Sequence, residues 1–188
     1  HMAENGAIQV LQRDGLLVKY RIPEVIGRPS ITLMLHGWTG DENSMWIFSE
    51  KMPQDSILIS PRGLFDSPLG GFSWYPKETR MWPALDDFSS AIEALDQLLR
   101  WETFSAGDLS NIRLVGFSQG AALAYSFAIE KPKIVLAVAG LSGFVPQGVE
   151  KLISMQPLAG KSVFVAHGTK DKIVPVEIKY GKTIANSY

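Results

Sequence analysis

The sequence contains no cysteine and only three histidines among its 188 residues. The absence of cysteine excludes disulfide bonds, cysteine nucleophiles and thiolate metal sites, and it agrees with the cytoplasmic location that we expect. The net charge of −1 gives no electrostatic reason to expect nucleic acid or an anionic membrane surface as a partner. No apolar run approaches the length of a membrane span, and the N-terminus lacks the pattern of a signal peptide. We therefore expect no nucleic-acid partner and no stable membrane insertion.

The length and composition are those of one globular domain. An apolar share of 46% over 188 residues is enough for a substantial core. The sequence has no internal repeat, low-complexity tract or linker. His1 and Met2 resemble a cloning scar before Ala3, so His1 is left out of the chemistry and the expected single domain is residues 3–188.

Apolar residues recur with two periods along the chain. Alternation over residues 7–22, around a turn at residues 12–15, predicts a β-hairpin, and short continuous apolar runs predict buried strands. Spacings of three and four over residues 87–101 predict an amphipathic helix. Such alternation of strands and helices predicts an α/β fold, with a mostly parallel central sheet and helices on both faces. The other expected elements are strands at 31–35, 57–59, 112–115, 134–139 and 163–166, helices at 43–52, 120–130 and 175–188, and a helix or loop at 146–158.

The segment Gly116-Phe117-Ser118-Gln119-Gly120 lies between a predicted buried strand and a predicted helix of small apolar residues. A serine on such a sharp turn is held in a strained backbone conformation with its Oγ above the sheet, and the flanking glycines leave room for the turn. The Gln119 N–H then lies at a helix N-terminus, where it can donate to an oxyanion. We predict Ser118 as a nucleophile and the Gln119 N–H as an oxyanion donor. An ordinary strand-to-helix turn is the alternative.

Two further polar segments, residues 36–41 and 167–171, also follow predicted strands. Because chemistry in such sheets lies at the carboxyl ends of the strands, we expect both segments near Ser118. A backbone N–H near Trp38 suits a second oxyanion donor. Asp171 falls where the acid of a Ser…Asp…His order belongs, and a surface aspartate paired with a neighbouring lysine is the alternative.

Residues 64–83 form a long segment rich in glycine, proline and aromatic residues. A loop of this length inside a compact domain is usually functional. One interpretation is an apolar pocket for the acyl group of an uncharged ester. The other, which the sequence leaves equally open, is a loop whose aromatic residues cover a satellite of the core. The side chains predicted to contact substrate are Phe72, Trp74, Tyr75 and Trp82.

Together these motifs resemble the α/β-hydrolase superfamily, and within it the phospholipase/carboxylesterase family, which includes bacterial carboxylesterases and acyl-protein thioesterases. The resemblance implies the α/β-hydrolase fold, with Ser118 as nucleophile, Asp171 as triad acid, and Gln119 and Trp38 supplying the oxyanion N–H groups. It also implies a small-molecule carboxylic ester as substrate, with no metal and no cofactor. The residues that carry it are Leu35-His36-Gly37-Trp38-Thr39-Gly40-Asp41, Pro61-Arg62-Gly63, Gly116-Phe117-Ser118-Gln119-Gly120-Ala121 and His167-Gly168-Thr169-Lys170-Asp171 with Val174-Pro175.

One member of the triad order is missing from the sequence. The histidine of this order follows the acid after one more strand, yet no residue after Asp171 is a histidine. We expect that the chain is truncated at its C-terminus and lacks the last strand, the histidine loop and the final helix. His36 is expected to shape the oxyanion loop and His167 to be structural, rather than to act as the base. The predicted strand 163–166 would then be an unprotected sheet edge, through which a homo-oligomer could form.

Three functions are open for this sequence. The first, which we predict, is a serine carboxylesterase that works through an acyl-enzyme on Ser118, with weak activity in the 188-residue form. The second is a catalytically inactive α/β-hydrolase fragment or binding module. The absent histidine favours it, whereas the intact serine turn and Asp171 favour the enzyme. The third, an acyl-protein thioesterase or lysophospholipase, shares the whole site and differs only in its substrate.

Overall fold

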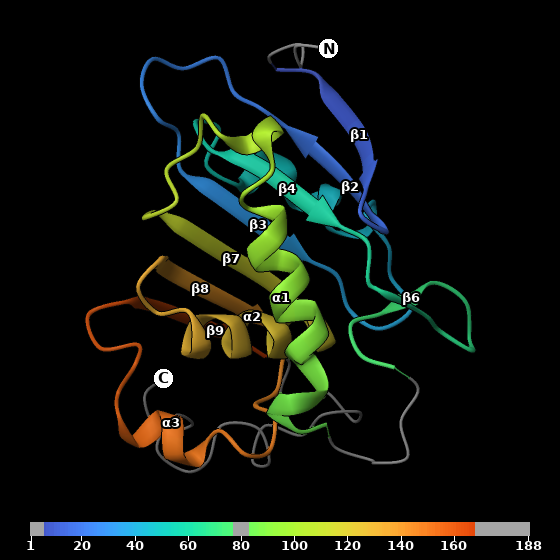
Figure 1. The fold of residues 1–188 in the computed structure, drawn as a ribbon, viewed down its shortest axis with the longest axis vertical. Helices are drawn as coiled ribbons and strands as arrows, with labels where there is room; N and C mark the ends of the chain where they lie inside the picture. The colour runs from blue at the N-terminus through green and yellow to red at the C-terminus, as the bar shows by residue number, and fades with distance from the viewer. Residues whose placement is uncertain (1–5, 77–82, 168–188) are drawn as a thin grey trace.

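The computed structural model describes residues 6–76 and 83–167 of the chain (Figure 1). They are built around a seven-stranded sheet with the strand order β1-β2-β4-β3-β7-β8-β9. β1 pairs antiparallel with β2, and β2 with β4, whereas all other neighbours in this sheet are parallel. The predicted mostly parallel α/β sheet is therefore confirmed. The strands are β1 (Ile8–Arg13), β2 (Leu16–Arg21), β3 (Ile31–Leu35), β4 (Ile57–Pro61), β7 (Ile112–Phe117), β8 (Val135–Leu141) and β9 (Ser162–Ala166).

The hairpin predicted at the N-terminus is β1 with β2. Its two-residue turn consists of Asp14 and Gly15, both with positive φ, at 52° and 79°. Two left-handed residues match the right-handed twist of the flanking strands, and aspartate and glycine are the residues that tolerate this conformation. The turn thus fixes the register that pairs Arg13 with Leu16.

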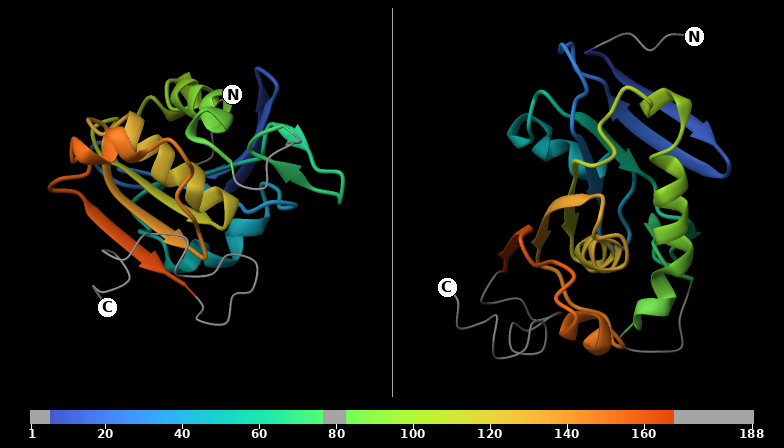
Figure 2. Two further views of the ribbon diagram at one scale, coloured as in Figure 1. Left: turned by 90° about the horizontal axis from the view of Figure 1, so that it is seen from below. Right: turned by 60° about the vertical axis from the view of Figure 1, so that its left-hand side comes forward.

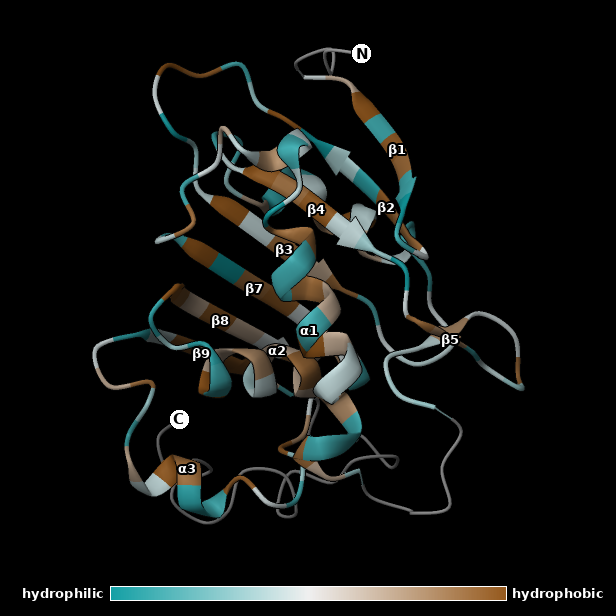
Figure 3. Ribbon diagram, viewed as in Figure 1, coloured by the Kyte–Doolittle hydropathy of each residue, from teal (hydrophilic) through white to brown (hydrophobic). Residues whose placement is uncertain are grey.

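Helices cover the two faces of the sheet. α1 (Ser89–Leu98) and α2 (Gln119–Glu130) pack on one face, and the 3₁₀ helix η1 (Ser44–Lys51) packs on the other (Figure 2). Every residue of β3 and β4 is buried, as their continuous apolar runs predict for strands covered on both faces (Figure 3). In the described part of the chain, no helix is long and apolar enough to cross a bilayer.

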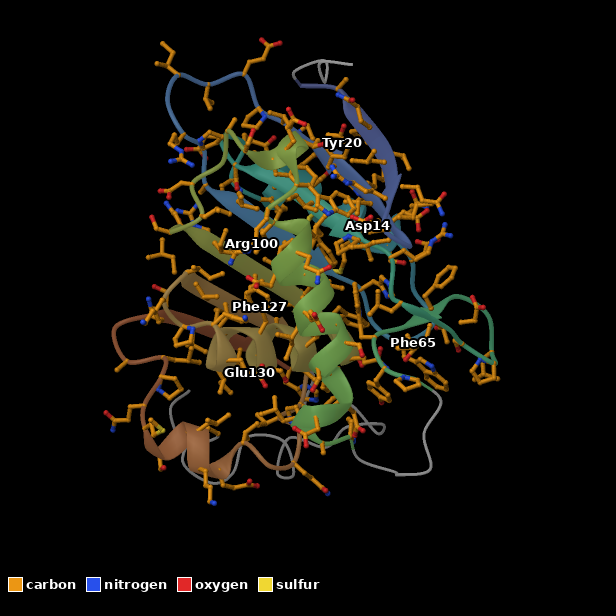
Figure 4. The ribbon with its side chains drawn as sticks, in the orientation of Figure 1. Asp14, Tyr20, Phe65, Arg100, Phe127 and Glu130 are labelled. Carbon is orange, nitrogen blue, oxygen red and sulfur yellow. The ribbon has the colours of Figure 1, made fainter. Side chains whose placement is uncertain are left out.

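The helix α2 lies at the centre of the molecule. Each of its residues from Gln119 to Ile129 is buried, which confirms the expectation from its apolar residues on all sides. Phe127, labelled in Figure 4, has no exposed surface. The first residue of α2 is therefore held by packing along the whole helix, which makes its N-terminus a rigid support for the turn before it.

Two expected helices differ from their predicted form, whereas residues 146–158, expected as a helix or a loop, agree with the prediction. The helix expected at 43–52 is the 3₁₀ helix η1, which buries only Met45 and Trp46 and is rich in aromatic and β-branched residues that favour helix weakly. The region expected as one helix at 87–101 consists of η2 (Leu85–Phe88), α1 and a turn before η3 (Glu102–Phe104), and the Asp87 carboxylate caps the start of η2 by accepting the Ala84 N–H at 2.7 Å. Residues 146–158 contain one short helix, α3 (Glu150–Ser154).

The segment 64–83 contains a small hairpin where the sequence predicted only a loop. β5 (Phe65–Asp66) pairs antiparallel with β6 (Phe72–Ser73), and Gly70 and Gly71, at φ 88° and 67°, reverse the chain between them. Figure 4 shows Phe65 on this hairpin, to one side of the sheet. Residues 77–82, with Trp82, and the helix expected at 175–188 lie outside the described residues.

Candidate active site

Ser118 lies at the turn between β7 and α2 in a backbone conformation that is rare for an L-residue. Its φ is 51° and its ψ is −114°. Such a conformation costs on the order of 1–3 kcal/mol and persists only where neighbouring groups hold it. Here the Ser118 N–H donates to the Leu141 carbonyl at 2.8 Å, and the Ser118 carbonyl accepts the N–H groups of Ala121 and Ala122 at 3.0 and 3.2 Å. The turn is therefore fixed both to the next strand and to the helix.

The two glycines of the motif allow backbones to approach closely. A Cβ on Gly116 would overlap the carbonyl oxygen of Gly120, and a Cβ on Gly120 would overlap the carbonyl oxygens of Leu35 and His36. Both positions therefore require glycine for space, as the sequence analysis expected. The close contact of Gly120 with the end of β3 also draws the next polar segment towards Ser118.

That segment is the turn Gly37–Gly40, closed by a hydrogen bond from the Gly40 N–H to the Gly37 carbonyl at 3.0 Å. Gly37 lies directly beside the serine: a Cβ placed on it would be 3.4 Å from Cβ of Ser118. The backbone of Trp38 follows at once, and its side chain is half exposed. On the other side of Ser118, Gln119 is the first residue of α2, where a backbone N–H has no acceptor within the helix. The structure thus brings Ser118, Gln119 and the turn containing Trp38 together.

His36 is buried behind this turn with both ring nitrogens engaged. Its Nε2 accepts the Gly63 N–H at 2.9 Å, so Nδ1 carries the proton that it donates to the Gly37 carbonyl at 2.6 Å. Burial lowers the pKa of His36 and keeps the ring neutral, although the Gly37 bond and the nearby carboxylates act in the opposite direction. The ring therefore joins Gly63, which follows β4, to the turn Gly37–Gly40. This agrees with the structural role expected for His36 from the sequence.

An ion pair that the sequence analysis did not assign supports the same turn. Nε and Nη2 of Arg62 donate to the two carboxylate oxygens of Glu42 at 2.7 and 2.9 Å. These bonds hold the pKa of Glu42 below its usual range. The guanidinium also lies over the Phe72 ring, 4.4 Å from its centre. The only sequence signal for this contact was the segment Pro61-Arg62-Gly63, which resembled the family without indicating a role.

The four aromatic residues predicted to contact substrate occupy different environments. Trp74 is fully buried, donates from Nε1 to the His36 carbonyl at 2.8 Å and lies 4.9 Å from the His36 ring. This places Trp74 behind the turn as a support. Phe72 and Tyr75 are partly exposed, and Tyr75 packs edge-on against Phe88 at 5.2 Å. Trp82 lies outside the described residues.

Backbone hydrogen bonds align the ends of β7, β8 and β9. The Ser118 N–H donates to Leu141, and the N–H of Ser142 donates to the Ala166 carbonyl, each at 2.8 Å. Because neighbouring strands lie about 4.8 Å apart, the end of β9 at Ala166 is about 10 Å from the end of β7. Asp171 lies outside the described residues, so its position relative to Ser118 stays a prediction.

The strand order, the central α2 and the strained serine turn between β7 and α2 together define the α/β-hydrolase fold. The sequence model of the phospholipase/carboxylesterase family matches residues 28–186, and the chain belongs to this family.

Known proteins similar to this chain include enzymes of several kinds. A Bacillus subtilis (strain 168) protein, to which a 2-succinyl-6-hydroxy-2,4-cyclohexadiene-1-carboxylate synthase activity is ascribed, is 31% identical over 138 residues; the match covers 71% of this chain and 43% of that protein. Acyl-protein thioesterase 1 of Yarrowia lipolytica is 27% identical over 179 residues, covering 86% of this chain and 77% of the relative. The crystal structure of esterase PE8 superposes with a TM-score of 0.63 at 25% identity, covering 80% of this chain and 73% of that one. The chain thus spans less than half of the Bacillus relative and about three quarters of the other two.

Proposed function

We propose that this chain is a serine hydrolase that cleaves carboxylic esters through an acyl-enzyme on Ser118. The observation that carries the proposal is the left-handed backbone of Ser118, with φ at 51°, between β7 and α2. A strand and a helix can be joined without such strain, so its retention at a serine is a functional signal. Membership of the phospholipase/carboxylesterase family supports the same class of chemistry.

In the proposed reaction, the Ser118 Oγ attacks the carbonyl carbon of the ester and transfers its proton to a base. The carbonyl oxygen becomes an oxyanion, which the backbone N–H groups of Trp38 and Gln119 stabilise by donating to it. Collapse of this intermediate expels the alcohol, which takes the proton from the base, and leaves the acyl group on Oγ. Water then releases the carboxylic acid by the same steps and restores the serine.

Asp171 is the proposed acid that orients the base. No histidine follows Asp171 among the 188 residues, so the sequence does not identify the residue that acts as the base. His36 has both ring nitrogens bound to backbone groups, so it is not free to accept the serine proton. We expect slow turnover that added imidazole accelerates, because a small base can act where a side chain is lacking.

The test is hydrolysis of a p-nitrophenyl ester over a range of imidazole concentrations, with the Ser118→Ala variant measured in parallel. Imidazole also cleaves such esters in free solution, so the enzymatic part is the difference between the two proteins. A difference that grows and saturates with imidazole supports the proposal. Equal rates for both proteins at every concentration would contradict it and favour a binding module.

Labelling of Ser118 by a fluorophosphonate provides a second, independent readout. A fluorophosphonate phosphorylates an activated serine with loss of fluoride, so intact-mass analysis reports the adduct and peptide mapping locates it. We expect labelling at Ser118 that increases with imidazole and is absent from Ser118→Ala. Labelling confined to another residue would count against Ser118 as the nucleophile.

A thioesterase acting on acylated proteins is the second candidate, because the Yarrowia lipolytica relative named acyl-protein thioesterase 1 aligns with 86% of this chain. The same serine chemistry cleaves a thioester, with a thiol as the leaving group. The partly exposed Phe72 and Tyr75 are proposed to contact the acyl chain in either case. Comparison of kcat/KM for an acylated cysteine peptide and for the matching oxygen ester separates the two candidates.

A further inference from the structure

Gln119 has a buried side chain whose hydrogen bonds the proposed reaction does not use. The residue is only 4% exposed. Its Oε1 accepts the Trp74 N–H at 2.7 Å, and its Nε2 donates to Oγ of Ser73 at 3.1 Å. The Ser73 hydroxyl in turn donates to the Tyr75 carbonyl at 2.8 Å. The amide thus joins the first residue of α2 to the strand β6 and the residue after it.

The same strand holds the turn on the other side of Ser118. The Thr39 N–H donates to the Phe72 carbonyl at 3.0 Å, and the Phe72 N–H donates to the Gly40 carbonyl at 2.9 Å. Gly71 packs so closely against Thr39 that a Cβ there would overlap the Thr39 carbonyl. The turn Gly37–Gly40 therefore takes its position from β6 as well as from the end of β3.

Three consecutive residues thus contact both sides of the candidate oxyanion hole. Phe72 binds the turn that contains Trp38, while Ser73 and Trp74 bind the side chain of Gln119. The indole of Trp74 also donates to the carbonyl of His36, the residue directly before the turn, at 2.8 Å. The segment of β6 and Trp74 consequently connects the turn that contains Trp38 to Gln119, on either side of Ser118.

We propose that the Gln119 side chain is a positioning residue, which sets the Gly37–Gly40 turn relative to Ser118 through β6. This inference rests on the proposed function for its catalytic consequence, but the mechanical link between Gln119 and the turn stands apart from it. The backbone N–H of residue 119 would serve as an oxyanion donor with any side chain. The glutamine is needed because its amide offers an acceptor for Trp74 and a donor for Ser73 at the same time.

The direct test is amide hydrogen exchange in the Gln119→Met variant of the full 188-residue chain. Methionine has a similar length but neither amide group, so the link to β6 is lost while the packing volume is nearly kept. We expect exchange at the Thr39 N–H to accelerate roughly three- to tenfold, as for the loss of one net hydrogen bond. Exchange at the Met52 N–H, which donates to the Ser49 carbonyl at the end of η1 on the other face of the sheet, is expected to stay unchanged, because its local opening does not involve β6.

Two further variants make the result specific. Gln97→Met makes the same chemical change on the exposed face of α1, and it is expected to leave Thr39 exchange unchanged. Ser73→Ala removes the Ser73 hydroxyl, with its bonds to Gln119 and Tyr75, and keeps the bond between Trp74 and Gln119, so we expect a smaller acceleration at Thr39. Ser73→Ala also decides the question if Gln119→Met does not fold. Unchanged Thr39 exchange in the folded variants, or equal acceleration at Thr39 and Met52, would overturn the inference.

Imidazole-assisted ester hydrolysis then measures the catalytic consequence. A displaced oxyanion donor acts mainly on the transition state, so we expect kcat to fall by about tenfold to a hundredfold in Gln119→Met while KM changes little. A change in KM alone would overturn the positioning role. Accelerated Thr39 exchange without any Ser118-dependent hydrolysis in the wild type would instead refute the proposed function and leave the mechanical link standing.

Discussion

Ser118 has a backbone conformation that an L-residue adopts at a cost in free energy. With φ at 51°, the residue lies in a region that glycine enters freely. We expect Ser118→Gly to be more stable than the wild type by about 1 kcal/mol, because relief of the left-handed strain exceeds the entropy that glycine loses on folding. The same change removes the hydroxyl and abolishes Ser118-dependent hydrolysis. Urea titration followed by tryptophan fluorescence measures the free energy of unfolding.

Ser118→Ala is the matched comparison for that experiment. It also lacks the hydroxyl but keeps Cβ, and with it the strain, so its stability should stay within about 0.5 kcal/mol of the wild type. If the glycine variant is no more stable than the alanine variant, the backbone of Ser118 is not strained. A nucleophile whose removal stabilises the fold would show that this position is shaped for a task other than folding.

His36 makes stability depend on pH. Burial lowers its pKa in the folded protein, whereas the unfolded chain has a histidine pKa of about 6.5. Below pH 6.5 the unfolded state therefore binds more protons, and stability falls as the pH falls, by up to about 1.4 kcal/mol per pH unit. We expect full stability above about pH 7 and a decline towards pH 5. The change is measured by urea titration at a series of pH values.

The variant His36→Gln removes the titrating ring, so it should reduce the slope of stability against pH over this range even though it lowers stability at pH 7. His167→Asn is the comparison that reports how much of the slope comes from a histidine other than His36, since His167 directly follows β9. An unchanged slope in His36→Gln would mean that another group titrates in this range. His36 would then bind a proton in the folded protein as readily as in the unfolded chain, and the bond from the Gly63 N–H to Nε2 would be lost on protonation without a measurable cost.

Local sequence patterns predicted Ser118 and the candidate oxyanion donors, but not the contacts that hold them. The motif around Ser118 is contiguous, and its flanking strand and helix have clear apolar patterns. By contrast, the pair of Glu42 with Arg62 joins residues 20 positions apart, and Gln119 bonds to residues 45 and 46 positions away. Such contacts depend on which strands become neighbours, and no spacing in the sequence encodes that.

At the scale of elements, the close approach of α2 to the end of β3 is the feature most sensitive to substitution. A Cβ on Gly120 would overlap the carbonyl oxygens of Leu35 and His36, which are backbone atoms and cannot rotate away. We expect Gly120→Ala to lower the free energy of unfolding by about 2–4 kcal/mol. Thermal denaturation followed by circular dichroism measures the loss.

Gly148→Ala is a suitable comparison, since a Cβ there meets open space but φ is 85°. Its cost should be limited to the strain of a left-handed alanine, about 1 kcal/mol. Similar losses for the two variants would mean that α2 moves away from β3 to make room for a methyl group. In that case the close contact would not fix the distance between the serine turn and the turn Gly37–Gly40.

The regular elements followed from periodicity wherever burial is one-sided or complete. β3, β4 and α2 were predicted from their continuous apolar residues. Such runs are typical of strands and helices that neighbouring elements cover on all sides. The region 43–52 was misjudged, because η1 buries only Met45 and Trp46, too little for an apolar pattern to distinguish a 3₁₀ helix from an α-helix. The hairpin of β5 and β6 was missed because two-residue strands have no period at all.

At the scale of the whole molecule, one sheet separates two apolar clusters of unequal size. The larger joins α1 and α2 to the sheet, while the smaller consists of Met34, Met45, Trp46 and Leu58 beneath η1. Coverage decreases towards β9, where Val163 and Phe164 are 41% and 55% exposed. Phe117, at the end of β7, is also exposed, at 44%. Exposed apolar side chains therefore occur on both edge strands of the sheet, on β9 and, with Ile8 and Val10, on β1.

The β9 edge of the sheet leads to a prediction about association. Among residues 6–76 and 83–167, β9 pairs with β8 alone, and no strand of these residues covers its other edge, beside exposed Val163 and Phe164. Such an edge favours pairing with a second chain, and a charged side chain on it opposes pairing. We expect sedimentation velocity to show self-association that grows with protein concentration and that Val163→Lys reduces.

Val10→Lys places the same charge on β1, the opposite edge strand, where Val10 is 61% exposed. An interaction through the β9 edge should be weakened by Val163→Lys and not by Val10→Lys. If both variants reduce association equally, or if the wild type stays monomeric at high concentration, the β9 edge is not the contact.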